Sequence, residues 1–192
     1  MGLVWPFAGR VGELQLIRDA LKNETGIVLA GAPGVGKTRL AHEAITQADP
    51  RRYVSLWATA TSGTRTVPLG AFAPLLAARP RPGPVSLLRD ATHALLERAG
   101  TRRLVLVVDD AHLLDEVSAT LVHRLARARA AFVLASLQSR CAVPDPIRAL
   151  WKDALAIRVE VAALSLADTA NLLSAVLGGQ VDGVTSRRLC QV

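Results

Sequence analysis

Apolar and polar positions follow one another along this chain in blocks that predict strands and helices in alternation. Short, mostly apolar runs predict five strands, at 27–30, 53–59, 104–108, 131–137 and 155–161. Apolar residues at helical spacing predict four helices among these strands, over 10–22, 37–48, 85–100 and 116–128. Strands that alternate with helices indicate an α/β fold built on a parallel sheet.

Two stretches between the second and third predicted strands break this alternation. Residues 60–70, ATSGTRTVPLG, have the composition of a loop. The RPRPGP sequence at 79–84 predicts a proline-rich break between two short helices.

The last part of the chain has a helical pattern only. Ser165 and Asp168 have the spacing of a capping box, and the helix they predict continues over 169–179 to a pair of glycines. A further helix begins near Thr185, and the sequence ends inside it, so we expect this part to be truncated. The predicted domains are a nucleotide-binding domain over 1–162 and the beginning of a helical subdomain over 163–192.

The segment between the first strand and the next helix is rich in glycine. It reads GAPGVGKT over 31–38, with Gly31, Gly36, Lys37 and Thr38 at the G-x-x-x-x-G-K-[ST] spacing of a P-loop, or Walker A motif. Glycines let backbone amides surround a phosphate, Lys37 would reach the β- and γ-phosphates, and the Thr38 hydroxyl would bind Mg²⁺. The alternative is a tight turn without a ligand. The predicted nucleotide-binding residues here are Gly31, Ala32, Pro33, Gly34, Val35, Gly36, Lys37, Thr38 and Arg39.

Two adjacent acids follow the third predicted strand, in LVLVVDD, which resembles a Walker B motif. Ligands of open parallel sheets collect at the carboxyl ends of such strands. We expect Asp109 to hold Mg²⁺ beside Thr38. We expect Asp110 to be catalytic and to orient or deprotonate the attacking water, with Lys37 as the other catalytic residue. The alternative is a turn or capping pair. Aspartate is one methylene shorter than glutamate, so slow turnover is expected. His112 is interpreted as a surface or capping histidine rather than a general base.

The composition limits the class of protein. Hydrophobic residues make up 51% of the 192 positions, which excludes a disordered chain, and no apolar run is long enough to span a bilayer. The first residues lack a signal-peptide pattern, and Cys141 and Cys190 have no metal spacing, so we expect a cytoplasmic protein. The net charge of +7 comes from scattered arginines, and the aromatic content of 4% argues against nucleic-acid binding by this segment.

Four motifs occur in an order that resembles a known family. FAGRVGEL precedes the first helix, GAPGVGKTRLA follows the first strand, LVVDDAHLLD contains the acid pair, and VAALSLADTANLL leads into the last helices. Together they resemble the ATPase module of large LuxR-type transcriptional regulators. These belong to the STAND branch of the AAA+ P-loop ATPases, which includes the maltose-regulon activator. The resemblance covers nearly all of the chain and is weaker over 60–100.

This resemblance implies features that the residues alone do not give. The fold is a three-layer sandwich with sheet order 5-1-4-3-2 and a helical lid that starts near Ser165. Phe7, Gly9 and Arg10 help to frame the adenine of ATP or ADP. The family has a sensor arginine after the fourth strand, in a segment like ATVRSG. Here the segment is ASLQSR, with Gln138 at that position and Arg140 two residues later, so that either residue is a candidate for the sensor.

The resulting hypothesis is an ATP-binding, slowly hydrolysing switch module of a LuxR-type regulator, with ATP or ADP and Mg²⁺ as cofactors. We expect protein partners or self-association through the ATPase module, DNA contacts only through a domain outside this chain, and no membrane contact. The alternatives are a stand-alone P-loop enzyme, such as a small-molecule kinase, and a protein-interaction domain with a vestigial nucleotide site.

Overall fold

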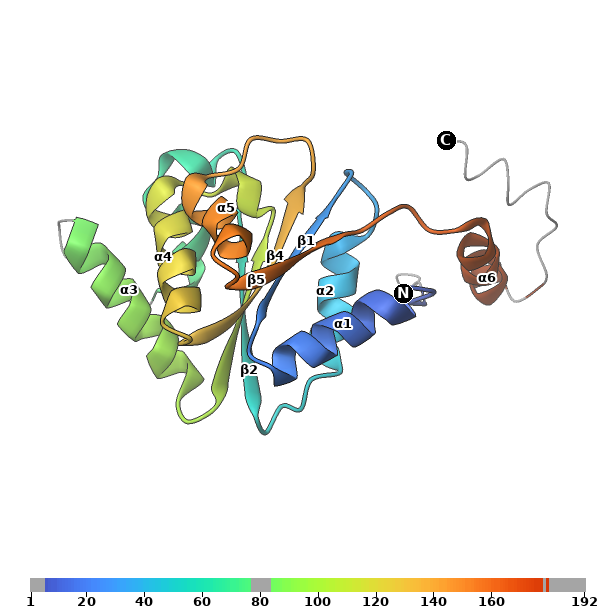
Figure 1. Ribbon diagram of the computed structural model, residues 1–192, viewed down its shortest axis with the longest axis horizontal. Helices are drawn as coiled ribbons and strands as arrows, with labels where there is room; N and C mark the ends of the chain where they lie inside the picture. Colours follow the sequence, from blue (N-terminus) through green and yellow to red (C-terminus); the bar gives the residue numbers. More distant parts are fainter. Residues whose placement is uncertain (1–5, 77–83, 178, 180–192) are drawn as a thin grey trace.

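Five parallel strands form the central sheet of the chain, whose structure is a computed structural model (Figure 1). The structure describes residues 6–76, 84–177 and 179. The strands are β1 Gly26–Gly31, β2 Tyr53–Thr59, β3 Arg103–Asp109, β4 Ala131–Gln138 and β5 Ala156–Glu160. Their order across the sheet is β2-β3-β4-β1-β5, which confirms the predicted α/β fold and the predicted order 5-1-4-3-2.

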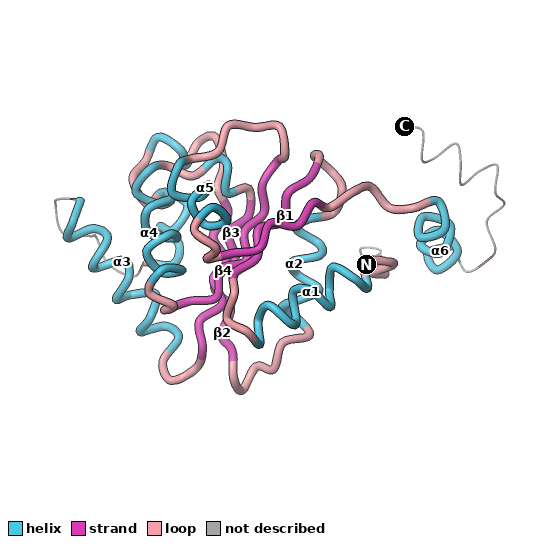
Figure 2. The backbone as a smooth tube through the Cα atoms, in the orientation of Figure 1, coloured by secondary structure: helices cyan, strands magenta, loops and turns pink. Residues whose placement is uncertain are grey.

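Helices cover both faces of this sheet, as Figure 1 and the tube in Figure 2 show. One face carries α1 (Val11–Lys22) and α2 (Lys37–Thr46). The other face carries α3 (Pro84–Ala99), α4 (Glu116–Arg127) and α5 (Asp145–Lys152). A last helix, α6 (Leu166–Leu177), lies apart from the sheet, and none of its residues is buried. Within residues 6–76 and 84–177, no helix combines the length and the apolar character needed to cross a membrane.

A separate hydrophobic core stabilises each face of the sheet. Side chains point alternately to the two faces of a strand. In β1, Ile27 and Leu29 therefore pack in the core beneath α1 and α2, whereas Val28 and Ala30 pack in the core beneath α3, α4 and α5. All four are fully buried, and burial of one such leucine or isoleucine contributes about 1.5–3 kcal/mol. The strand that leads into the P-loop is therefore held firmly from both sides.

Most element boundaries lie within two residues of the prediction. The capping box at Ser165 is confirmed, since the Asp168 N–H donates to Ser165 Oγ at 3.0 Å and α6 begins at Leu166. The predicted loop at 60–70 is partly wrong. It contains the 3₁₀ turn η1 (Thr64–Thr66) and leads into a second one, η2 (Gly70–Leu75), because the buried side chains of Leu69 and Phe72 anchor this stretch in the core. The break predicted at 79–84 and the helix predicted near Thr185 lie outside the described residues, apart from Pro84, where α3 begins.

The carboxyl ends of three neighbouring strands meet at one edge of the sheet. Gly31, at the end of β1, pairs with Gln138 at the end of β4. Val108 on β3 pairs with Ala135 on β4, so Asp109 follows directly beside the same edge. The register therefore brings three segments that lie far apart in the sequence to one place.

Candidate functional site

The loop between β1 and α2 encloses a hollow at this edge of the sheet. Gly34 and Gly36 have φ angles of 77° and 93°, a left-handed conformation that glycine adopts without strain. A Cβ atom at Gly31 would lie 2.5 Å from the carbonyl oxygen of Val161, so a side chain there would displace the backbone. The cavity above the loop measures about 340 Å³ and is lined by Pro33, Gly34, Gly36, Lys37, Thr38, Arg39, Asp110 and Gln138.

Helix α2 begins at Lys37, whose side chain is buried, with 7% of the residue exposed. Its Nζ donates hydrogen bonds to the carbonyl oxygens of Gly31 at 3.1 Å and Ala32 at 2.8 Å. These neutral acceptors hold the ammonium group against the loop. A phosphate oxygen is a stronger, charge-assisted acceptor for the same group, so an anion in the cavity can compete for it.

Thr38, which lines the cavity, is hydrogen-bonded to Asp109, although 71 residues separate them in sequence. The Thr38 Oγ1 lies 3.0 Å from both carboxylate oxygens of Asp109. Ser136, on β4, completes this cluster: its Oγ donates to Oδ1 of Asp109 at 2.5 Å and accepts from the backbone N–H of Asp110 at 2.9 Å. Sequence reasoning missed Ser136. The only signal for it was a small polar residue inside the apolar run AFVLASL.

Asp110 lies in a left-handed turn directly after β3, with φ 53° and ψ 44°. This conformation is uncommon for a residue with a side chain, and here the Asp110 N–H donates a hydrogen bond to Ser136 Oγ. The Asp110 side chain is 39% exposed and lines the cavity at the P-loop. The structure thus brings the second acid to the P-loop with its carboxylate facing solvent.

His112 is buried, with 4% of its surface exposed, which contradicts the interpretation as a surface histidine. The turn η3 (Ala111–Leu113) carries it inward because Ala111 and Leu114 belong to the core. Burial lowers the pKa of His112 below its usual 6.5. Asp110 and, more weakly, Asp109 raise this pKa, and the cations of Lys37 and Arg65 lower it. The net shift is downward, so the imidazole is neutral at pH 7.

Gln138 and Arg140 both line a hollow of about 600 Å³ between the P-loop and the end of β5. Only Gln138 also lines the cavity beside Lys37 and Thr38. Among the residues that line that cavity, Lys37 and Arg39 are the cations, and β4 contributes none.

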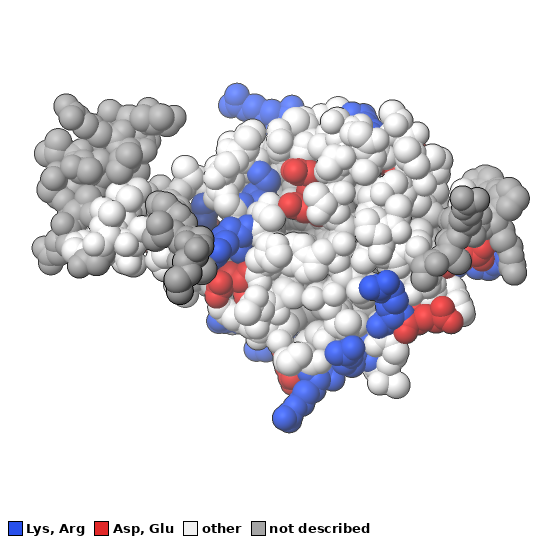
Figure 3. Space-filling model, turned by 180° about the vertical axis from the view of Figure 1, so that it is seen from behind, with Lys and Arg blue, Asp and Glu red and all other residues white. Residues whose placement is uncertain are grey.

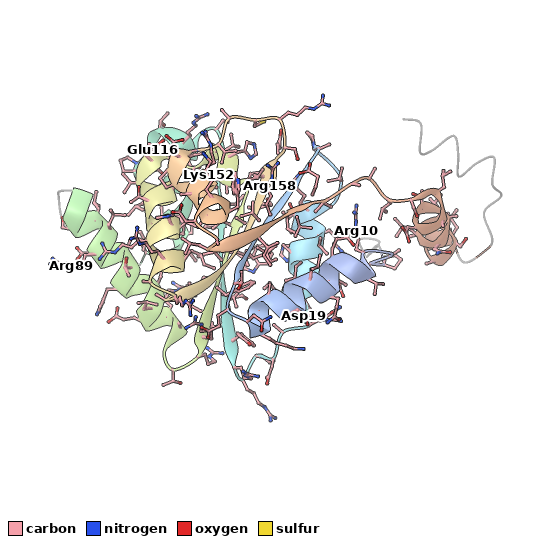
Figure 4. All side chains as sticks on the ribbon, in the orientation of Figure 1. Arg10, Asp19, Arg89, Glu116, Lys152 and Arg158 are labelled. Atoms are coloured by element: carbon pink, nitrogen blue, oxygen red, sulfur yellow. The ribbon has the colours of Figure 1, made fainter. Side chains whose placement is uncertain are left out.

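The three residues expected to frame an adenine lie before and at the start of α1. Phe7 packs against the core of the α1–α2 face. Gly9 has φ 68°, and a Cβ atom there would lie 2.8 Å from the carboxyl carbon of Asp168 in α6. Arg10 is 8% exposed; its guanidinium donates to the carbonyl oxygens of Val35 at 3.0 Å and Ala162 at 2.5 Å. Figure 4 shows Arg10 close to the segment that joins β5 to α6.

The donor set fits a magnesium ion that is shared with a phosphate. No cluster of three or more His, Cys, Asp or Glu side chains suited to a metal occurs in the described part of the chain. Mg²⁺ commonly takes one or two protein ligands and completes its shell with waters and substrate phosphates. Thr38, which lines the cavity, and Asp109, which is hydrogen-bonded to it, are residues of this kind.

On the face drawn in Figure 3, most of the surface is uncharged, and the Lys and Arg side chains form several small groups, some of them beside Asp or Glu, with no continuous basic area. Arginines elsewhere pair with carboxylates, as Arg103 does with Glu24 at 3.0 Å and Arg148 with Asp145 at 3.3 Å. Nucleic-acid binding depends on clustered cations. The face in Figure 3 has no continuous area of that kind.

Comparison with known protein families gives one match, to the family described as "AAA ATPase domain", over residues 6–141. The matched region contains the P-loop, both acids and Gln138. No curated protein sequence matches the chain.

Several solved structures share this fold. The Orc1 protein of Aeropyrum pernix in complex with DNA is 13% identical, with a TM-score of 0.67 over 92% of this chain and 51% of that one. The S. cerevisiae Hsp104:casein complex is 18% identical, with a TM-score of 0.60 over 89% of this chain and 30% of that one. Drosophila ORC bound to AT-rich DNA and Cdc6 is 13% identical, with a TM-score of 0.52 over 80% and 59%. This chain spans about half of the first of these proteins.

Proposed function

Because the chain belongs to the AAA ATPase domain family, we propose that it binds Mg²⁺·ATP at the P-loop and hydrolyses it slowly to ADP and phosphate. One observation carries the proposal: the Thr38 hydroxyl, which lines the cavity of the P-loop, lies 3.0 Å from the Asp109 carboxylate. When bound, Mg²⁺ would neutralise charge on the phosphates.

The residues around the cavity have separate tasks in this proposal. The amides of the loop and the start of α2 bind the phosphates, and Lys37 exchanges its two carbonyl partners for phosphate oxygens. Thr38 and Asp109 hold the metal side, while Asp110 orients the water and accepts its proton. Gln138 can donate a hydrogen bond but no charge, which supports slow turnover.

Lys37→Ala tests the assignment of the nucleotide site. Loss of a charge-assisted hydrogen bond to phosphate costs about 1.5–3 kcal/mol, so we expect ATP affinity in Mg²⁺ to fall at least about tenfold with the fold intact. Calorimetry measures the affinity, and Lys22→Ala, on an exposed lysine of α1, is the matched control. Equal affinity of Lys37→Ala and the wild type would refute the P-loop assignment.

Product analysis separates this proposal from its alternatives. Release of both ADP and inorganic phosphate supports an ATPase. ADP without free phosphate would indicate transfer to an acceptor, as in a kinase. Binding without products would leave a nucleotide-dependent interaction domain, and absence of binding would mean a vestigial site.

We propose further that the module is the nucleotide switch of a larger, cytoplasmic LuxR-type regulator of the STAND class, in which a separate domain contacts DNA. The order of the four sequence motifs supports this. Arg10 supports the switch, because its guanidinium joins Val35 of the P-loop to Ala162 on the way to α6. Protein partners or a second copy would act on this module. A helix-turn-helix sequence downstream of residue 192 would support the regulator, and a different downstream domain would refute it.

Proteolysis tests the switch directly. The exposed segment after Val161 contains Ala162 and Ala163, which elastase cleaves. The cleavage rate should differ between the ATP-bound and ADP-bound chain if the nucleotide changes this segment. Equal rates at saturating ATP and ADP would refute the switch while leaving the nucleotide site in place.

A further inference from the structure

A buried polar atom without a partner lies beside Asp110, the proposed general base. The Nδ1 atom of His112 has no hydrogen-bond partner within the part of the chain that the structure describes. The Oδ1 atom of Asp110 is 3.8 Å away. An N–H···O hydrogen bond spans about 2.9 Å, so the two atoms are about 1 Å too far apart to form one. Because buried polar atoms nearly always have a partner, this one requires an explanation.

The imidazole is fixed, whereas the carboxylate is not. His112 follows Ala111, which is fully buried, and the backbone carbonyl of Asp110 accepts from Leu113 N at 2.8 Å. Ser136 holds the Asp110 amide at 2.9 Å. The carboxylate of Asp110, in contrast, accepts no hydrogen bond from any described residue and faces the cavity. A hydrogen bond between His112 Nδ1 and Asp110 Oδ1 therefore requires only that the Asp110 side chain move by about 1 Å.

The charge state of the imidazole suits a donor role. Burial keeps His112 neutral at pH 7, and the groups that act on it are Asp110, Lys37, Arg65 and Asp109. A neutral imidazole carries one N–H, and the tautomer with the proton on Nδ1 directs it at Asp110. A carboxylate is the stronger, charge-assisted acceptor for that N–H.

We propose that His112 is a positioning residue for ATP hydrolysis: in the nucleotide-bound chain its Nδ1–H donates to Oδ1 of Asp110 and leaves Oδ2 free to accept the proton of the attacking water. The inference rests on the proposed ATPase function. In the reaction the water oxygen bonds to the γ-phosphorus, the bond from that phosphorus to the β–γ bridging oxygen breaks, and ADP leaves with the electron pair. Asp110 takes one proton of the water. His112 exchanges no proton.

The hydrogen bond from His112 would orient the carboxylate of Asp110, whose side chain is one methylene shorter than that of glutamate. A free carboxylate at this position samples several orientations, and a displacement of about 1 Å at a reacting group costs up to about 100-fold in rate. A hydrogen bond from a fixed imidazole selects one orientation. His112 therefore acts through Asp110 and does not touch the substrate.

Three variants separate this role from a structural one. His112→Asn keeps an N–H donor close to the place of Nδ1, whereas His112→Leu keeps bulk and has no donor. We expect kcat to fall about 10- to 100-fold in His112→Leu and to stay within a few-fold of wild type in His112→Asn, with ATP affinity unchanged in both. His123→Leu is the matched control, since the Nε2 atom of His123 also lacks a partner in the described chain but faces Asp153 near the start of β5. It should retain the wild-type kcat.

The effect should depend on Asp110. In an Asp110→Asn background, His112→Leu should cause no further loss, because the two residues act as one unit. An equal loss in both backgrounds, or equal rates for the Leu and Asn variants, would overturn the proposal and indicate a structural role.

A measurement that needs no turnover decides the matter even where hydrolysis is absent. The ¹⁵N shifts of the His112 ring report which nitrogen carries the proton. With Mg²⁺ and a non-hydrolysable ATP analogue bound, we expect the Nδ1–H tautomer in the wild type and its loss in Asp110→Asn. The Nε2–H tautomer in the wild type would refute the inference. Failure to hydrolyse ATP would refute only the ATPase proposal.

Discussion

Replacing Ser136 by alanine tests whether one buried hydroxyl holds both acids of the site. The side chain is 3% exposed, donates to Asp109 at 2.5 Å and accepts from the Asp110 N–H at 2.9 Å. Alanine removes a hydrogen bond to a charged group and leaves a partly buried N–H without its partner, and each loss costs about 1–3 kcal/mol. Thr38 remains a partner of Asp109, so we expect the free energy of unfolding to fall by about 2–4 kcal/mol, measured by urea denaturation.

The same change should weaken metal binding, because groups that orient a metal ligand typically account for about 10- to 100-fold in affinity. Calorimetry of ATP binding at a series of Mg²⁺ concentrations measures this effect. Ser118→Ala is the control: Ser118 is fully buried and donates to Asp115 at 2.5 Å, at the start of α4, so it should lose stability but keep the wild-type Mg²⁺ dependence. A Ser136→Ala protein with the Mg²⁺ dependence of the wild type would refute the role given to this hydroxyl.

Three other outcomes can be checked. Asp110→Asn should keep Mg²⁺·ATP affinity near wild type and abolish phosphate release; a collapse of affinity would mean that Asp109 and Asp110 have exchanged roles. Gln138→Arg should increase the preference for ATP over ADP in competition binding, whereas Arg140→Ala, in the hollow near the end of β5, should change it little; loss of a strong preference in Arg140→Ala would make that residue the sensor. Because the pKa of His112 is lowered in the folded chain, the unfolded chain binds more protons below pH 6.5, so stability should fall as the pH drops below that value and not rise. His112→Asn should flatten this dependence in urea denaturation.

Most elements were predictable because they have a local signal, but the sequence analysis missed helix α5 (Asp145–Lys152). The apolar run of β3 identifies a strand without knowledge of the rest of the chain. The glycines at the end of β1 and after it identify a turn in the same way. The sheet order came from the resemblance of the motifs to a family, since nothing local in the sequence says that β1 pairs with β4 and β5.

The contacts that complete the site depend on that pairing. Ser136 reaches Asp109 only because β3 and β4 are neighbours, and no spacing within either segment indicates it. His112 is buried because the 3₁₀ turn after β3 packs against the core. The polar sequence DDAH gives no indication of this burial. Arg10 lies against Ala162, 152 residues away, so its role as a bridge had no signal in either segment.

The position of β1 in the sheet also governs when the site can form during synthesis. Both neighbours of β1 come later in the chain, and Ile27 pairs with Leu134, which is made 107 residues later (134 − 27). At about 5–20 residues per second, the ribosome needs about 5–20 s to cover that distance. Throughout this delay the apolar strand that ends in the P-loop has no partner strand. A nascent chain should therefore acquire ATP only after β4 has left the ribosome, when β1 gains the first of its two partner strands.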